Sequence, residues 1–362
     1  MIKVLHVLNA APQIGGLELS FARLAPALLE CGVQSTALLI GSDEGSAEVL
    51  AKHLPVLRTQ DRGLIVDALQ KADVVHMHGA SCTAWPRAVP RLAKRARRPL
   101  VFTIHLPRYP PIGTWSPGRV RVSAQLLAYG VYLARTTTRV VAPSDAAAAM
   151  ARRRFGPWLR VSRFLYGAPD HGASAVPQGP LRLAFVGRLD PHKQPLVFVE
   201  SVAAAVAQGV DVHAEMAGDG SQADEVRALI SAKGLEDRIT LLGRIEHPDP
   251  LLRRSHVLVF TSDAEGCPVS AIEAAAVGRG VICRAGIEGL TELWGVGSIL
   301  VAPEGGADEF AAAYETVASD LSRAALMGEA ARHLFQAEFD DRVAAGRWAA
   351  LYGEATAKPA LR

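Results

Sequence analysis

The sequence predicts an α/β protein made of two Rossmann-like domains, each built on a parallel sheet. Short apolar runs rich in β-branched residues alternate with longer Ala- and Leu-rich stretches, and this alternation stops at residues 174–180 and then begins again. Strands that alternate with helices are typical of parallel sheets covered by helices. The length of 362 residues suits two domains of about 150 to 200 residues each.

The Pro- and Gly-containing segment Ser174–Pro180 is the best candidate for a linker. We therefore expect one domain over residues 1–173 and a second over residues 181–335. Residues 336–362 are expected to form a C-terminal helix that packs back on the first domain. Ligands of such folds bind in the cleft at the carboxyl ends of the strands, so this is where functional residues are sought.

The elements follow from the positions of the apolar runs. In the first domain we expect strands at Lys3–Leu8, Ser35–Ile40, Val74–His76, Leu100–Ile104 and Arg139–Ala142, and helices that include Glu18–Cys31 and Ala84–Arg95. In the second we expect strands at Leu181–Val186, Val212–Ala217, Ile239–Leu242, Val257–Phe260, Gly280–Cys283 and Ser298–Val301. Its helices are expected at Gln194–Gln208, Ala223–Lys233, Ser270–Val277 and Ala307–Ser319. The tail Arg323–Ala357 is Ala-rich and helical, with Phe335, Phe339, Trp348 and Tyr352 as anchors.

Composition limits the possible locations of the protein. No run of 18 apolar residues is present, and the first residues form a strand-like run rather than the pattern of a signal peptide. We expect a cytoplasmic protein that can lie at the inner face of the plasma membrane. The four cysteines are scattered without a CxxC pair, which argues against a zinc site or disulfides, and we expect each to be buried as a small apolar side chain.

Charge is distributed unevenly between the two halves. Residues 1–176 contain 22 Lys and Arg against 10 Asp and Glu, a net charge of +12, whereas residues 177–362 contain 17 against 26, a net charge of −9. A basic half attracts anionic membranes, nucleic acids or phosphorylated substrates. The stretches Arg87–Arg98 and Arg152–Arg163 interleave arginines with Pro, Phe and Trp, and we favour docking to an anionic membrane surface for them.

Two glycine-containing loops follow strands. Gly15 and Gly16 lie between the first strand and a helix, where backbone N–H groups can approach an anion, although a Gly-Gly pair alone is weak evidence. Gly187, Arg188 and Lys193 follow the strand Leu181–Val186. Two cations five residues apart at a strand end can bind a diphosphate, Arg through its planar fork and Lys as a point charge.

Two glutamates eight residues apart form the next candidate. Glu265 lies in a Gly/Pro loop after a strand, and Glu273 lies inside the following helix. Carboxylates at such positions accept hydrogen bonds from sugar or ribose hydroxyls, while the helix N-terminus favours a phosphate. Solvated helix-capping carboxylates are the alternative interpretation.

Three histidines lie at the ends of expected strands in the first domain. His76 and His78 end one strand, and His105 follows another. We interpret His76 as structural and His105 as a polar residue of the cleft. A metal site is the less favoured alternative, because an HxH pattern alone is weak and no acidic residue accompanies it.

Taken in order, these motifs resemble the glycosyltransferase family 4 type of retaining GT-B enzyme. The motifs are Gly187-Arg188-Leu189 with Lys193, Ala217-Gly218-Asp219-Gly220, Leu242-Gly243-Arg244, and Ser262 with Glu265-Gly266-Cys267-Pro268 and Glu273-Ala274. The first half matches more loosely, through Gly15-Gly16, the His76/His78 segment and the segment ending at His105. The resemblance implies a GT-B fold, in which two Rossmann-like domains face one another across a cleft, with acceptor binding by the first and donor binding by the second.

The resemblance also implies roles for individual residues. Catalytic roles fall to His105, Arg188, Lys193 and Glu265. Donor binding falls to Gly15, Gly16, Gly187, Arg188, Lys193, Gly243, Arg244, Ile245, Glu265, Gly266, Cys267, Pro268, Val269 and Glu273. Among these, Arg188 and Lys193 neutralise the leaving diphosphate, Glu265 faces the donor sugar and Glu273 receives the ribose hydroxyls. The sequence contains no Asp-x-Asp motif, and we expect no metal and no cofactor beyond the nucleotide-diphosphate sugar, with UDP favoured over GDP.

The partners expected are this donor, a glycan or lipid-linked acceptor from cell-surface polysaccharide or glycolipid synthesis, and an anionic membrane surface. The loop after Cys283 departs from the family pattern, since Gly289-Leu290-Thr291-Glu292 stands where Gly-Ile/Val-Pro-Glu is usual; this departure weakens any inference about the sugar. The alternatives are an epimerase-like GT-B protein or phosphorylase, and a nucleotide-binding protein whose basic half binds nucleic acid. No RRM, KH or zinc signature supports nucleic-acid binding, and we expect none.

Overall fold

The computed structural model describes residues 1–9, 16–40, 44–79, 88–104, 117–263, 265, 268–287, 289–290 and 294–357. The chain divides into two compact units. Unit 1 comprises Met1–Gly167 and Asp341–Arg362, and unit 2 comprises Ala168–Asp340. Among the described residues, no helix is both long and apolar enough to cross a bilayer.

Unit 1 contains a seven-stranded parallel sheet in the order β3-β2-β1-β4-β5-β6-β7. Its strands are β1 (Ile2–Asn9), β2 (Val33–Ile40), β3 (Val56–Arg58), β4 (Val74–Gly79), β5 (Leu100–Ile104), β6 (Arg139–Ala142) and β7 (Val161–Arg163). Its helices are α1 (Gly16–Arg23), α2 (Ala25–Glu30), α3 (Glu44–Ala51), α4 (Arg62–Lys71), α5 (Ala88–Arg95), α6 (Pro117–Thr136), α7 (Asp145–Phe155) and α15 (Asp341–Ala357).

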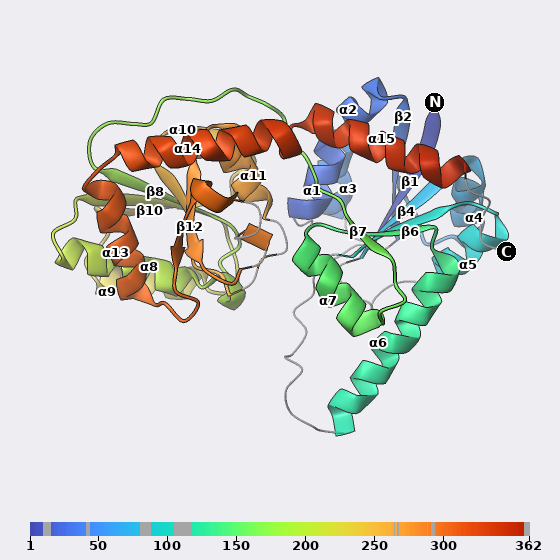
Figure 1. Cartoon of the computed structure of the whole chain (residues 1–362), viewed down its shortest axis with the longest axis horizontal. Coiled ribbons are helices and arrows are strands. Elements are labelled where there is room, and N and C mark those ends of the chain that lie inside the picture. The colour runs from blue at the N-terminus through green and yellow to red at the C-terminus, as the bar shows by residue number, and fades with distance from the viewer. Residues whose placement is uncertain are drawn as a thin grey trace. The chain divides into compact units, whose positions relative to one another are not determined.

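Helices cover both faces of this sheet. Successive side chains of a strand point to opposite faces, and the side chains of β1 belong to two different apolar clusters. Leu5 and Val7 of β1 belong to an apolar cluster with residues of α4, α5 and α7. Val4 and Leu8 belong to a second cluster with residues of α1, α2 and α15. Helix α15, the last of the chain, therefore completes the unit that contains the first strand, and it lies beside α2 (Figure 1).

Unit 2 contains a six-stranded parallel sheet in the order β10-β9-β8-β11-β12-β13. Its strands are β8 (Leu181–Val186), β9 (Val212–Ala217), β10 (Ile239–Gly243), β11 (Val257–Phe260), β12 (Gly280–Arg284) and β13 (Ser298–Val301). Helices α8 (Pro195–Ala207), α9 (Ala223–Ala232) and α13 (Ala307–Ala318) cover one face, and α10 (Asp249–Arg253), α11 (Val269–Ala276) and α14 (Ser322–Leu334) cover the other (Figure 1). Short helical segments η1 (Pro191–Lys193), η2 (Gly295–Gly297) and η3 (Phe335–Phe339) complete it.

Some expectations about the elements are corrected by the structure. The stretch Glu18–Cys31 forms two helices rather than one, and Pro26 at the start of α2 explains the break because proline lacks the N–H that would continue α1. Cys31 is exposed, because it lies just beyond the end of α2, whereas Cys283 is buried as expected. The aromatic anchors of the C-terminal tail are all buried: Phe335, Phe339, Trp348 and Tyr352.

Candidate functional site

The candidate site lies at the point of unit 2 where the strand order reverses. Strand β8 pairs with β9 on one side and with β11 on the other, although β11 follows β10 in the chain. The loops that leave the carboxyl ends of β8 and β11 diverge at such a point, and open parallel sheets bind ligands there. These two loops contain Arg188, Lys193 and Glu265, so the fold brings the predicted residues to one edge of the sheet.

The loop after β8 is held by the loop after β9. The Gly187 N–H donates to the Ala217 carbonyl at 3.0 Å, and the Leu189 N–H donates to the Asp219 carbonyl at 2.9 Å. Gly218 has φ +151°, and a Cβ atom there would lie 1.8 Å from the Gly187 carbonyl oxygen. Only glycine fits this close approach of two backbones, which explains the first glycine of the Ala217–Gly220 motif.

Arg188 forms an ion pair with Asp190 at 2.8 Å. The Asp190 carboxylate also accepts hydrogen bonds from the backbone N–H and the hydroxyl of Ser221, each at 3.0 Å. These two bonds, together with the nearby Arg188 charge, hold the pKa of Asp190 below its ordinary value. Arg188 itself remains 61% exposed, so its guanidinium is held by Asp190 and is still accessible to a ligand.

Lys193 and Glu265 form a second and more buried ion pair. The ammonium nitrogen lies 2.5 Å from Glu265 Oε1, with side chains that are 17% and 8% exposed. The Ser262 hydroxyl donates to the same carboxylate oxygen at 2.7 Å. The Lys193 stem runs alongside Gly187, where a Cβ atom would lie 3.8 Å from its Cε. One cation and one carboxylate thus share the edge of the sheet at the reversal point.

The segment that carries Lys193 is fastened to the end of β11. The Thr261 hydroxyl hydrogen-bonds the carbonyls of Lys193 and Gln194, each at 2.9 Å. The Asp263 N–H donates to the His192 carbonyl at 3.1 Å, and the Gln194 side chain donates to the Asp263 carboxylate. These bonds fix Lys193 and Glu265 relative to each other.

Arg284 also stabilises the loop after β11 through hydrogen bonds. Its buried guanidinium donates to the carbonyls of Thr261 at 2.6 Å and Gly305 at 2.8 Å. Sequence reasoning missed Arg284 together with Asp190, Thr261 and Asp263. Thr261 and Asp263 closely follow β11, so their position at the carboxyl end of a strand could have drawn attention to them, whereas Arg284 is the last residue of β12 and Asp190 lies four residues beyond β8.

Of the remaining predicted donor residues that the structure describes, all but Gly16 lie in unit 2. Gly243 ends β10 with φ +63° and accepts a hydrogen bond from Gly218 N–H at 2.8 Å; Arg244 and Ile245 follow it. Pro268 caps α11, Val269 begins it and Glu273 is half-buried within it. Gly16 begins α1 of unit 1. Four further predicted residues lie outside the described part of the chain: Gly15, His105, Gly266 and Cys267.

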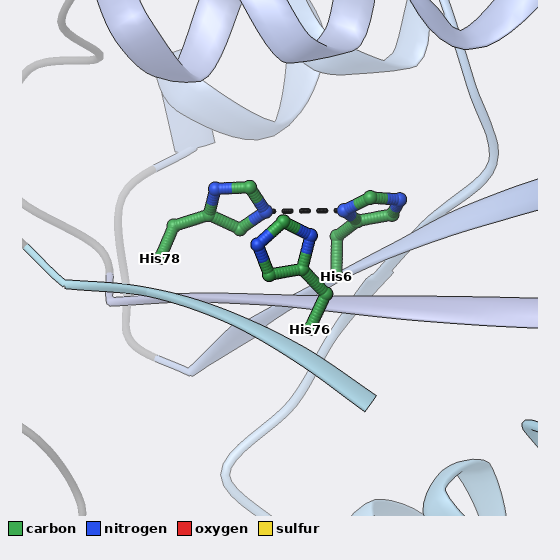
Figure 2. Close-up of side chains that lie close together, drawn as sticks. All are labelled: His6, His76 and His78. Atoms are coloured by element: carbon green, nitrogen blue, oxygen red, sulfur yellow. Dashed lines mark hydrogen bonds between the residues drawn. The ribbon is translucent and has the colours of Figure 1, made fainter. Parts of the chain in front are cut away.

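In unit 1 the structure gathers three buried histidines (Figure 2). His6 of β1 and His76 of β4 are paired in the parallel register and lie side by side on one face of the sheet. His78 lies two residues further along β4, on the same face. His6 Nδ1 lies 3.1 Å from His78 Nε2, and both nitrogens of His76 are hydrogen-bonded to hydroxyls. Burial lowers the pKa of His6 to about 3. Sequence reasoning considered His76 and His78 but missed His6, which pairing of β1 with β4 would have supplied.

Comparison with known proteins identifies the family. The family model described as "Glycosyltransferase Family 4" matches residues 14–163, and the family model described as "Glycosyl transferases group 1" matches residues 180–320. Solved structures cover nearly the whole chain: HepE of Anabaena in complex with UDP-glucose has a TM-score of 0.76 at 20% identity over 98% of this chain and 100% of that chain. A glycosyltransferase of Rickettsia africae has a TM-score of 0.77 at 19% identity over 98% of both chains. The chain belongs to the family 4 (group 1) glycosyltransferases, and its two units form the GT-B fold.

Curated relatives match shorter stretches. An alpha-D-kanosaminyltransferase of Streptomyces kanamyceticus is 26% identical over 221 residues, which is 57% of each chain. A Campylobacter jejuni alpha-1,4-N-acetyl-D-galactosaminyltransferase, whose name describes a PP-undecaprenol-linked saccharide, is 31% identical over 91 residues, or 25% of this chain and 24% of the relative. The matches therefore span little more than half of the first relative and a quarter of the second.

Proposed function

We propose that this protein transfers a sugar, with retention of configuration, from a nucleotide-diphosphate sugar to a glycan or lipid-linked acceptor. UDP is the favoured nucleotide. One observation carries the proposal: the Lys193–Glu265 pair and the Arg188–Asp190 pair lie on loops from the two strands that flank the reversal point of unit 2. The cations suit a diphosphate, and the carboxylate beside them suits sugar hydroxyls.

The chemistry asked of these groups is stabilisation of the leaving diphosphate. When the bond from the sugar to the phosphate breaks, negative charge develops on the diphosphate oxygens. Arg188 and Lys193 are already fixed by neighbouring groups, so they can stabilise this charge without large rearrangement. Glu265 accepts hydrogen bonds from hydroxyls of the donor sugar, and Glu273 accepts hydrogen bonds from hydroxyls of the ribose. This assignment follows the family resemblance.

Binding measurements test the donor site. Against a panel of nucleoside diphosphates and their sugars, followed by thermal shift and calorimetry, the wild-type protein should bind one nucleotide class preferentially. Arg188→Ala and Glu273→Ala should each weaken binding at least about 10-fold, because each removes a hydrogen bond that involves a charged group. Arg227→Ala is the matched control, since Arg227 lies exposed on α9 and pairs there with the exposed Asp224. Unchanged affinity in both site variants would refute the site.

Turnover separates the transferase from its alternatives. A transferase should release the nucleoside diphosphate rapidly only when an acceptor is added. An epimerase would convert the donor sugar without an acceptor, and a phosphorylase would require inorganic phosphate. Lipid-linked saccharides are the first acceptors to try, because the Campylobacter relative is named for one.

A membrane-bound acceptor would suit the basic charge of unit 1. The last turn of helix α7 contains Arg152, Arg153 and Arg154, and Trp158 beyond the helix is 49% exposed. An exposed tryptophan beside cations is typical of a surface that rests on anionic lipid. Co-sedimentation should show more protein bound to vesicles with phosphatidylglycerol than to neutral vesicles, and Arg153→Glu with Trp158→Ser should remove the difference. Equal binding to both kinds of vesicle would refute membrane docking.

A further inference from the structure

The three-histidine cluster of unit 1 is not explained by sugar transfer. His6, His76 and His78 are 1%, 1% and 4% exposed. One ring nitrogen from each lies within 4.8 Å of the others, and the rings converge from two neighbouring strands (Figure 2). Nitrogen atoms of three imidazoles seldom meet inside an apolar layer without a reason, because burying polar groups costs free energy.

We propose that His6, His76 and His78 form a binding site for one divalent transition-metal ion of the zinc type. Two nitrogens bound to one tetrahedral zinc ion at 2.0–2.1 Å lie about 3.3 Å apart. His6 Nδ1 and His78 Nε2 are 3.1 Å apart, so an ion can replace the proton they share with little movement of either ring.

The third ring requires a larger adjustment. The His6 ring centroid lies 5.3 Å from those of His76 and His78, close to the separation of about 5 Å expected for imidazoles on one tetrahedral ion. The His76 and His78 centroids are only 4.0 Å apart. These two rings must open by about 1 Å to place a nitrogen of His76 on the ion.

Hydroxyl groups support two of the three rings, His6 and His76, in the way that metal ligands require. A histidine that binds a metal usually donates its other ring N–H to an oxygen, which fixes the orientation of the ring. His6 Nε2 lies 3.2 Å from the Ser35 hydroxyl. His76 has Tyr352 at 2.8 Å on Nδ1 and Thr103 at 2.7 Å on Nε2. Whichever nitrogen of His76 turns to the ion, the other keeps a hydroxyl partner.

The donor set selects the ion. Three imidazole nitrogens suit Zn²⁺, Cu²⁺, Ni²⁺ and Co²⁺, whereas Mg²⁺ and Ca²⁺ require oxygen ligands. Three protein ligands leave a fourth position for hydroxide or another anion, which offsets part of the charge. Because the ligands come from β1 and β4 and the hydroxyls come partly from α15, the ion would stabilise unit 1 by binding only its folded state.

Metal content of the tag-free protein tests the site. Since the cluster is buried, the protein is refolded with excess Zn²⁺ and then passed over a chelating resin, and bound metal is measured by mass spectrometry. We expect one Zn²⁺ per chain, a higher melting temperature than after refolding with EDTA, and no retention of Mg²⁺. With Co²⁺ the visible absorption of a tetrahedral nitrogen site should appear.

Variants locate the ion. His78→Gln should reduce zinc affinity at least about 10-fold, and Ser35→Ala, which removes a partner of His6, should reduce it by about 10- to 100-fold. His213→Gln, on a half-exposed histidine of unit 2, should retain full binding. The proposal fails if the refolded wild-type protein holds no zinc, or if His78→Gln and wild type hold equal amounts. Neither readout depends on sugar transfer, so the result is independent of the proposed function.

Discussion

The cations of the candidate site are each neutralised by a carboxylate before any ligand arrives. For Lys193 this has a direct consequence, because Glu265 is nearly buried and binds the ammonium at 2.5 Å. If Lys193 binds the diphosphate as proposed, the diphosphate competes with Glu265 for it. A donor sugar provides the compensation, since its hydroxyls can then bond the carboxylate that Lys193 has left. Glu265 should therefore weaken binding of the nucleotide alone and favour binding of the sugar-bearing donor.

Replacement of Glu265 by Gln should separate these two effects. In Glu265→Gln the affinity for UDP should rise about 10-fold, because a competing charge-assisted hydrogen bond and a nearby negative charge are removed. The preference for UDP-sugar over UDP should fall. Calorimetry with UDP and with the UDP-sugar measures both quantities.

The matched control is Glu215→Gln. Glu215 belongs to the same unit and pairs with Arg254 at 2.7 Å, away from the loops of the site. The Glu215→Gln protein should bind UDP with the same affinity as the wild-type protein. If Glu265→Gln weakens UDP and UDP-sugar to the same extent, the carboxylate supports the local structure rather than competing for Lys193.

Elements of the sheets differ in how far sequence predicts them. Strands β8, β9, β11 and β13 are predicted with their observed bounds, because each is a short run rich in apolar residues, continuous in β11 and interrupted by polar residues in β8 and β9. Strands β3 and β7 were missed. Each has only three residues, of which none is buried in β3 and one is buried in β7. Neither strand carries a periodic signal, and only pairing with a neighbour makes it a strand.

The contact between the loops after β8 and β9 makes a prediction at this scale. Gly218→Ala should destabilise unit 2 and abolish nucleotide binding, because the added Cβ meets the Gly187 carbonyl and displaces the loop of Arg188. Gly234→Ala is the control: Gly234 also has positive φ (+63°), but its Cβ would enter open space. That variant should lose only about 1 kcal/mol of unfolding free energy and should bind nucleotide normally.

Strands β8 and β11 are joined by a histidine whose titration should affect the stability of unit 2. His256 Nδ1 accepts the Arg182 N–H at 2.9 Å, and Nε2 donates to the Pro177 carbonyl at 2.9 Å. Burial lowers its pKa, and the charges of Arg279 and Arg182 act in the same direction. The unfolded chain therefore binds the proton more readily than the folded chain.

The stabilisation should be complete above the unfolded pKa of about 6.5 and should decrease as the pH falls below that value toward the lower folded pKa. Urea unfolding at pH 7.5 and 5.5 measures the loss. His256→Asn retains an acceptor for the Arg182 N–H but cannot titrate, so its unfolding free energy should change less between the two pH values. An equal change in both proteins would assign the acid sensitivity to other groups.

At the scale of the whole chain, sequence predicts the two-sheet architecture and proposes the main site residues, but it indicates only part of the network around them. Arg188, Lys193 and Glu265 belong to an ordered set of motifs, so they could be found without a structure. Asp190 and Arg284 could not, because their partners are 31 and 21 residues away in sequence and depend on how loops approach. The same limit applies to His6, which joins His76 only through the pairing of β1 with β4.

The division into units makes the last prediction. Trp348 and Tyr352 of α15 are buried among residues of unit 1, and the Trp348 indole donates to the Leu165 carbonyl at 3.1 Å. Phe310 of α13 is buried in the core of unit 2. Each substitution to Ala should cost about 3–5 kcal/mol, because a large aromatic side chain leaves a cavity. The cost should fall on the unit that contains the cavity.

Hydrogen exchange measured by mass spectrometry distinguishes the units. Trp348→Ala should accelerate exchange in β1, β2 and β4 and leave β8, β9 and β11 protected, although Trp348 is separated from β1 by more than 300 residues of sequence. Phe310→Ala should produce the reverse pattern. If either variant accelerates exchange equally in both sheets, the two units unfold as one. In that case α15 would couple their stabilities rather than belong to unit 1 alone, since it is the segment by which the chain returns from unit 2 to the first sheet.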